Sequence, residues 1–298
     1  MEPTTGTAPQ PPSLFADLAE LTRFRLNMLA LATTAVGFLL GTEGAVRLGL
    51  LVHTLLGTGL VAAGSSVLNQ VLERESDALM HRTARRPIPA GRIHPDRALL
   101  LGVVLCAGGV IYLLLAANAL TALLAAITLV TYLFLYTPLK RVSSLATVIG
   151  AVPGAIPPMM GWAAIRGELS LPAWVLFGIL FLWQLPHFLA IAWIYRNDYE
   201  RGGLPMLPVV DPEGHVTSRQ MILYCGALLP VSLLTTVVGL NGALYLLGAV
   251  ILGLGFLAFC VAFAHNHTVL AARRLMLASV VYLPLLLAVM MLDFFTVH

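Results

Sequence analysis

Apolar runs of about 20 residues recur nine times along this 298-residue chain, and they constrain its fold more than any other feature. A helix needs about 20 apolar residues to cross a hydrocarbon core of about 30 Å, because it rises about 1.5 Å per residue. A helix also satisfies its own backbone hydrogen bonds inside the bilayer. The sequence therefore predicts an all-α, polytopic membrane protein built as a nine-transmembrane-helix bundle. The approximate bounds of the runs are 24–42, 48–68, 97–117, 119–136, 144–164, 172–194, 219–239, 242–264 and 274–293.

The composition excludes several classes of protein. Charged residues make up 10% of the chain, against about 25% in soluble domains, so a soluble enzyme and a disordered chain are both excluded. The net charge of +3 is small and scattered, which excludes a nucleic-acid partner. Residues 1–19 are rich in Pro and Thr and carry no basic residue. We therefore expect a disordered tail there, followed by a single transmembrane domain over residues 20–298.

Lysine and arginine are distributed unevenly between the two ends of the predicted helices. Fifteen of the 17 basic residues lie on one side, and the other two, Arg47 and Arg166, lie on the opposite side. Because cytoplasmic segments of membrane proteins are enriched in Lys and Arg, we expect a cytoplasmic amino terminus and a carboxyl terminus outside. The amino-terminal segment resembles neither a signal peptide nor a mitochondrial presequence, so we expect the bacterial cytoplasmic (inner) membrane.

Two cytoplasmic connections, at about 72–96 and 195–218, are longer and more acidic than the others. Together they hold eight of the 14 carboxylates of the chain. Long polar segments in a compact protein tend to carry function rather than only to link helices. We therefore expect the functional site in these two loops.

The first of these loops begins with three oxygen-bearing side chains at a regular spacing. Asn69, Glu73 and Asp77 are four residues apart in turn, so on a helix they share one face. Mg²⁺ prefers such oxygen ligands and completes its shell with water and substrate phosphates. The alternative interpretation is a solvated polar helix end.

A basic segment follows directly. Arg82, Arg85 and Arg86 lie within five residues, and Lys140 and Arg141 form a second basic pair at the end of the fourth run. The planar guanidinium group suits phosphate oxygens, so carboxylates and guanidinium groups side by side favour a metal–diphosphate site. The alternative is that these residues only anchor the chain at the cytoplasmic surface.

The sixth run carries an ionisable residue inside the predicted membrane. On one continuous helix, Trp183, His187 and Asp198 would lie close to one line. A histidine at that depth is expected to face the protein interior or a cavity, although a purely structural histidine is the alternative. Asp198 and Glu200 would supply a second group of carboxylates.

Taken together, these motifs resemble those of the UbiA-type intramembrane prenyltransferases. The pattern NxxxExxxD at 69–77, followed by HRTxxRP at 81–87, resembles the first motif of that family. Two further segments, WQLPHF at 183–188 and YRxDY at 195–199, resemble the branch of the family that farnesylates heme. So do TRFR, GAVPGAIPP and GxxMLP, at 22–25, 150–158 and 203–208. Glu73 and Phe24 depart from the family pattern, in which Asp and Pro are commoner at these places.

The resemblance implies transfer of a farnesyl group from farnesyl diphosphate to a vinyl group of heme B, giving heme O. The protein would be embedded in the lipid bilayer. Mg²⁺ would be held by Asn69, Glu73, Asp77 and Asp198, with Lys140 as a further catalytic residue. The implied diphosphate-binding residues are Arg82, Arg86, Lys140, Arg141 and Arg196, and the implied acceptor pocket contains His187, Trp183, Tyr136 and Tyr195. A downstream heme-modifying enzyme or an oxidase assembly partner would use the product.

Three other functions are the alternatives to farnesylation of heme. A UbiA-type prenyltransferase with a quinone or phenolic acceptor would have the same metal–diphosphate site. A transporter would place charges near the bilayer midplane, whereas here the carboxylates lie at helix ends. A heme carrier without catalysis would leave the cluster of carboxylates and arginines unexplained.

Overall fold

The computed structural model describes residues 13–297. Within this part, nine spans are long and apolar enough to cross a membrane, which confirms the predicted all-α, nine-span fold. Two spans are composite, because α6 (Ala119–Val130) continues through a π-helical turn at Thr131–Tyr136 into α7 (Thr137–Leu139), and α8 (Ala146–Ala155) is followed by α9 (Pro157–Arg166). The continuous ones are α2 (Phe24–Gly41), α3 (Leu48–Leu72), α5 (Pro95–Ala116), α10 (Leu171–Ile194), α13 (His215–Val237), α14 (Ala243–Asn266) and α15 (Val269–Val297).

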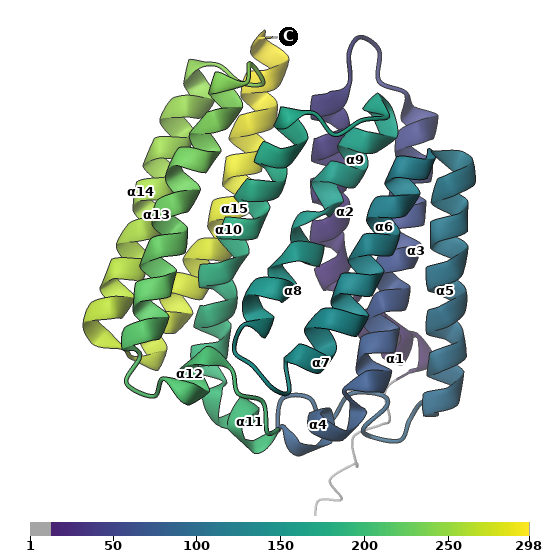
Figure 1. The fold of residues 1–298 in the computed structure, drawn as a ribbon, viewed down its shortest axis with the longest axis vertical. Helices are drawn as coiled ribbons and strands as arrows, with labels where there is room; N and C mark the ends of the chain where they lie inside the picture. Colours follow the sequence, from purple (N-terminus) through teal and green to yellow (C-terminus); the bar gives the residue numbers. More distant parts are fainter. Residues whose placement is uncertain (1–12, 298) are drawn as a thin grey trace, which may run out of the picture.

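The short helices gather at one end of the bundle, opposite the carboxyl terminus (Figure 1). They are α1 (Leu14–Leu21), α4 (Arg74–Leu79), α11 (Arg196–Arg201) and α12 (Leu207–Val210). We call this end, which also carries α7, the loop end. The two long acidic loops of the sequence therefore meet in space, as their common side of the membrane predicts.

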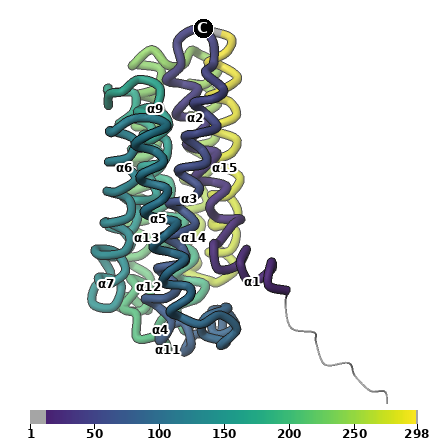
Figure 2. The backbone as a smooth tube through the Cα atoms, turned by 90° about the vertical axis from the view of Figure 1, so that its right-hand side faces the viewer, coloured from purple at the N-terminus to yellow at the C-terminus, as the bar shows by residue number. Residues whose placement is uncertain are grey.

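The spans form a ring in which neighbours along the chain pack side by side. In addition, α2 packs against α9 and α10 packs against α15. Figure 2 shows the long helices running roughly parallel from the loop end to the opposite end. The ring closes between α15 and α2, which pack against each other far less extensively than the other neighbours.

Glycine allows the close approach of α2 and α9. A Cβ atom at Gly161 would lie 1.9 Å from the Thr34 carbonyl oxygen, and one at Gly37 would lie 2.0 Å from that of Pro158. Both collisions are with backbone atoms, so no side-chain rotation relieves them. Small residues let membrane helices pack closely where lipid provides no hydrophobic driving force.

We predict that Gly161→Ala destabilises the protein by about 3 kcal/mol, the upper range for an overpacked core. The added methyl group can be accommodated only if α2 and α9 separate. Gly108→Ala is the matched control, because nothing lies within 4 Å of a Cβ atom there, and alanine is the better helix former by about 1 kcal/mol. Thermal unfolding in detergent measures both variants; equal melting temperatures would contradict the packing argument.

The amino-terminal boundary differs from the prediction. Residues 1–19 were predicted to form a tail, but α1 already begins at Leu14. Two contacts attach this helix to the rest of the protein. Leu21 is fully buried, and Arg92 forms an ion pair with Asp17 at 2.9 Å. Residues 1–12 lie outside the described part.

The predicted span 144–164 is interrupted at Ile156. The following residue, Pro157, has no N–H group to donate, which breaks the helical hydrogen-bond ladder. Across the interface, Gln184 Nε2 donates to the Ala151 carbonyl oxygen at 2.8 Å. Gln184 of α10 thereby links this helix to α8, close to the interruption at Ile156.

Candidate active site

The candidate site begins with Asn69, Glu73 and Asp77, which we call the acidic row. Helix α3 ends just before Glu73 and α4 starts just after it. The spacing survives this break, because Glu73 N donates to the Asn69 carbonyl oxygen at 2.9 Å and Asp77 N donates to that of Glu73 at 2.8 Å. The exposed fractions are 1%, 4% and 1% along the row. These groups are therefore not the solvated helix end of the alternative interpretation.

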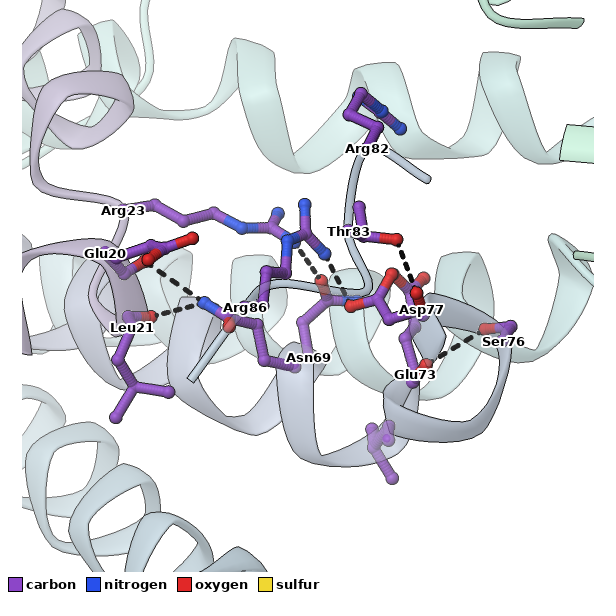
Figure 3. A network of polar contacts seen from close by, with 12 residues as sticks. Glu20, Leu21, Arg23, Asn69, Glu73, Ser76, Asp77, Arg82, Thr83 and Arg86 are labelled. Atoms are coloured by element: carbon purple, nitrogen blue, oxygen red, sulfur yellow. Dashed lines mark hydrogen bonds and ion pairs between the residues drawn. The ribbon is translucent and has the colours of Figure 1, made fainter. Parts of the chain in front are cut away.

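Each member of the acidic row contacts a cation from another part of the chain. Arg23 Nη2 donates to Asn69 Oδ1 at 2.9 Å, and Arg86 Nη1 lies 2.5 Å from Asp77 Oδ2. Figure 3 shows both guanidinium groups directed at the row. Lys140 Nζ, at the end of the α6–α7 span, lies 3.1 and 3.3 Å from the two carboxylate oxygens of Glu73. Positive charge from three segments is thus concentrated on the row.

One oxygen of the row is left over. Asp77 Oδ1 is buried and has no hydrogen-bond donor among the described residues, whereas Thr83 Oγ1 donates to the backbone oxygen of Asp77 at 2.8 Å. A buried carboxylate oxygen without a partner is costly and calls for an explanation such as an ion. The chemistry of this position therefore suits a cationic ligand.

Asp198 comes from the second loop and is joined to the first. Its Oδ1 accepts a hydrogen bond from His81 N at 3.3 Å and forms an ion pair with Arg201. Met80, next to His81, is buried against Tyr199 and other apolar residues of the second loop. The short segment between Met80 and Arg86 therefore connects Asp198 with the acidic row.

The predicted metal ligands do not form one compact cluster of acidic groups. Over residues 13–297, no three His, Cys, Asp or Glu side chains converge closely enough to hold a metal ion. The reason is that each carboxylate is turned toward its own cation. The four-residue ligand set remains a prediction.

Cations and aromatic rings alternate next to the row. The Arg82 guanidinium carbon lies 4.9 Å from the ring centre of Tyr195 and 5.4 Å from that of Tyr199. Arg82 Nη2 also donates to the Tyr199 hydroxyl at 3.2 Å. Lys140 Nζ lies 5.8 Å from the ring centre of Tyr199 and 6.0 Å from that of Tyr136. Tyr199 therefore stands between two of the predicted diphosphate-binding cations.

Three further residues of the site, Arg23, Tyr132 and Tyr199, were not predicted from the sequence. Tyr132 stacks on Tyr136, with ring centres 5.5 Å apart, and its hydroxyl accepts from Arg23 Nη1 at 3.1 Å. Arg23 adopts a left-handed backbone conformation with φ 49°, which is costly for a residue other than glycine and is often found at functional sites. The TRFR segment was the only signal in the sequence for Arg23.

Electrostatics keeps the Glu73–Lys140 pair ionised. Burial alone would raise the pKa of Glu73, but the charges of Lys140 and Arg23 hold it below its ordinary value. Burial alone would lower the pKa of Lys140, but Tyr136 and Glu73 raise it above its ordinary value. At neutral pH the pair is therefore a buried ion pair.

Comparison with known proteins identifies the family. The model of the UbiA prenyltransferase family matches residues 30–291. The chain belongs to this family. It is 49% identical to the protoheme IX farnesyltransferase of Solibacter usitatus (strain Ellin6076), over 93% of this chain and 98% of that protein.

Two solved structures show that the UbiA fold is shared. A digeranylgeranylglyceryl phosphate synthase superposes with a TM-score of 0.80 at 16% identity, over 95% of this chain and 99% of that one. A UbiA homolog from Archaeoglobus fulgidus, bound to GPP and Mg²⁺, superposes with a TM-score of 0.65 at 16% identity, over 92% and 99% of the two chains.

Two of the predicted diphosphate-binding residues of this UbiA prenyltransferase make other contacts. Arg141 Nη2 donates to the Leu72 carbonyl oxygen at 3.0 Å, which satisfies the end of α3. The Arg196 guanidinium carbon lies 4.8 Å from the ring centre of Trp193. Both residues lie at the loop end, but neither shares the contacts of the acidic row, and their diphosphate role remains a prediction.

The predicted acceptor pocket of this UbiA prenyltransferase divides into two groups. Tyr136 and Tyr195 lie among the cations at the loop end. His187 and Trp183 lie further inside the bundle on α10, with their rings stacked at 5.4 Å between centres and 15° between planes. The first group stands next to the predicted diphosphate site, and the second lies within the span.

Proposed function

We propose that this protein transfers the farnesyl group of farnesyl diphosphate to a vinyl group of heme B, giving heme O. The observation that carries the proposal is the buried acidic row with Arg86 and Lys140 directed at it. Such an arrangement suits a diphosphate leaving group. The Solibacter usitatus relative, a protoheme IX farnesyltransferase that aligns over nearly its whole length, supports heme as the acceptor.

We infer that Asn69, Glu73, Asp77 and Asp198 hold Mg²⁺. Their side chains offer oxygen donors, which this ion prefers, and a small number of protein ligands suffices because water and phosphate oxygens complete its shell. The unpartnered Asp77 Oδ1 fits this role. When bound, Mg²⁺ supplies Lewis-acid stabilisation of the diphosphate oxygens. The Archaeoglobus fulgidus homolog bound to GPP and Mg²⁺ supports the inference.

The basic residues act on the leaving group. When the bond between farnesyl C1 and the diphosphate oxygen breaks, its electron pair stays on the diphosphate, where negative charge grows. Arg82, Arg86 and Lys140 are held in place by carboxylates and tyrosines, so they can stabilise this charge without large rearrangement. Arg141 and Arg196 add positive charge around the same end.

The allylic cation left behind is stabilised by resonance and by aromatic faces. Cation–π contact with a ring such as Tyr136 contributes about 0.5–2 kcal/mol. The terminal carbon of the heme vinyl group then forms the new C–C bond. Water adds to the neighbouring carbon and loses a proton, so the former vinyl group gains a hydroxyl group.

We propose a position in the bacterial cytoplasmic membrane, and the charge distribution supports an orientation with the loop end in the cytoplasm. Fifteen of the 17 basic residues lie on the side of the predicted spans that forms the loop end, and cytoplasmic segments are enriched in Lys and Arg. The carboxyl terminus would then lie outside. A downstream enzyme or assembly partner that takes up heme O is also part of this proposal.

The test is an assay of the purified protein in lipid with heme B, farnesyl diphosphate and Mg²⁺, followed by mass spectrometry of the porphyrin. We expect a mass gain of one farnesyl group plus one water, which EDTA abolishes. Parallel reactions with a phenolic acid and a quinone precursor test the alternative acceptor. If one of these is prenylated and heme is not, the proposed acceptor is wrong while the diphosphate site stands.

A further inference from the structure

A serine on α15 contacts both Trp183 and His187, the two residues of the predicted acceptor pocket that lie within the span α10. Ser279 is fully buried, and its Oγ lies 2.7 Å from His187 Nδ1. Its backbone oxygen accepts a hydrogen bond from Trp183 Nε1 at 2.9 Å. Because the Trp183 and His187 rings are also stacked, one residue of α15 fixes the position of both.

The hydrogen bonds around Ser279 favour one position for the proton of the neutral His187 ring. A serine hydroxyl has one hydrogen to donate, and Ser279 Oγ donates it to the Met276 carbonyl oxygen at 2.6 Å. With that hydrogen directed at the carbonyl oxygen, the contact with His187 Nδ1 is assigned to an Nδ1–H group that donates to Oγ. In neutral imidazole the other nitrogen, Nε2, then carries the lone pair.

The Nε2 atom is available to a ligand. Among residues 13–297 it has no hydrogen-bond partner, because the ring contacts Ser279 through its other nitrogen, Nδ1. The side chain is only partly buried, and it lies seven residues before the end of α10, about 10 Å along the helix axis. Here Nδ1–H donates to a neighbouring oxygen and the lone pair of Nε2 is left for a ligand. Metal-binding histidines have this arrangement.

We propose that Ser279 is a positioning residue that keeps His187 in the tautomer whose Nε2 binds the iron of the heme substrate. The proposal rests on heme being the acceptor. Donation of Nδ1–H to a neighbouring oxygen orients a ligating histidine and makes it more basic. Iron binding at His187 would hold the porphyrin by its centre, which leaves the vinyl groups at its edge free to react.

The experiment is a titration of the purified full-length protein with ferric heme B, followed by absorption and EPR spectroscopy. We expect His187→Ala to abolish the signature of a histidine-bound iron. Ser279→Ala should keep that signature but shift it and weaken heme binding by about 10-fold, the lower range for the loss of an outer hydrogen bond. Ser279→Thr, which keeps the hydroxyl, should restore wild-type spectra.

Ser232→Ala is the matched control, because Ser232 is a buried serine whose hydroxyl also donates to the carbonyl three residues earlier, that of Leu229. It should leave the heme spectrum unchanged. Farnesyl transfer is measured on the same samples. Identical heme spectra for the wild type, His187→Ala and Ser279→Ala, with product still formed, would overturn this inference alone. A wild-type protein that does not modify heme would instead overturn the proposed function.

Discussion

Replacing Asp77 by asparagine should lower the rate of farnesyl transfer by about two to three orders of magnitude, the usual effect of removing a group that stabilises charge in a transition state. Asparagine keeps the shape of the side chain but removes the charge opposite Arg86. It also replaces one carboxylate oxygen by an NH₂ group, which cannot bind a metal ion. The rate is measured with heme B and farnesyl diphosphate over a range of Mg²⁺ concentrations.

Glu75→Gln is the matched control for this variant. Glu75 lies on the same short helix, but its side chain is 74% exposed and pairs with the exposed Arg74 at 3.5 Å. Its substitution should leave the rate almost unchanged, because an exposed side chain outside the acidic row stabilises no charge at the site, and exposed ion pairs add little to stability. Thermal unfolding checks that Asp77→Asn is folded at the assay temperature, because Arg86 loses its carboxylate partner in this variant. Unchanged turnover in a folded Asp77→Asn protein would refute the metal–diphosphate assignment.

Replacing Lys140 by methionine should destabilise the protein by about 3–5 kcal/mol, because it leaves the buried carboxylate of Glu73 without its partner. Methionine retains the length and the apolar stem of lysine, so the loss arises from the charge. Farnesyl transfer should fall as well, since Lys140 is expected to stabilise the departing diphosphate. Thermal unfolding and turnover are measured on the same preparation.

The pH dependence distinguishes this explanation from a loss of packing. In the wild type the folded-state pKa of Glu73 is lowered, so its contribution to stability is present at neutral pH and is lost only as the pH falls through that lowered pKa. In Lys140→Met, burial without the ammonium group raises the pKa of Glu73. The melting temperature of this variant should therefore rise from pH 8 to pH 5, where that of the wild type stays flat.

The double variant Glu73→Gln/Lys140→Met completes the test. It removes both charges, so it should regain part of the lost stability and lose the anomalous rise at low pH. A flat melting profile in Lys140→Met would show that Glu73 is not an uncompensated buried charge in that variant.

The positions of the spans and of the acidic row could be predicted because they depend on neighbouring residues. Each run of about 20 apolar residues meets the requirement of the bilayer by itself. The spacing of Asn69, Glu73 and Asp77 needs only the period of a helix, and it persists although the helix is broken at Glu73. Local sequence thus determined the architecture, and it placed the two acidic loops at one end.

Only the tertiary structure decided which groups meet. Lys140 reaches Glu73 across 67 residues, and Ser279 reaches His187 across 92. Both pairings depend on how the helices pack and on the rotation of each helix about its axis, for which an apolar run carries almost no signal. Ser279 lies in an otherwise ordinary apolar run. The physical reason is that hydropathy is a property of each segment alone, whereas a hydrogen bond or ion pair between helices requires the geometry of two.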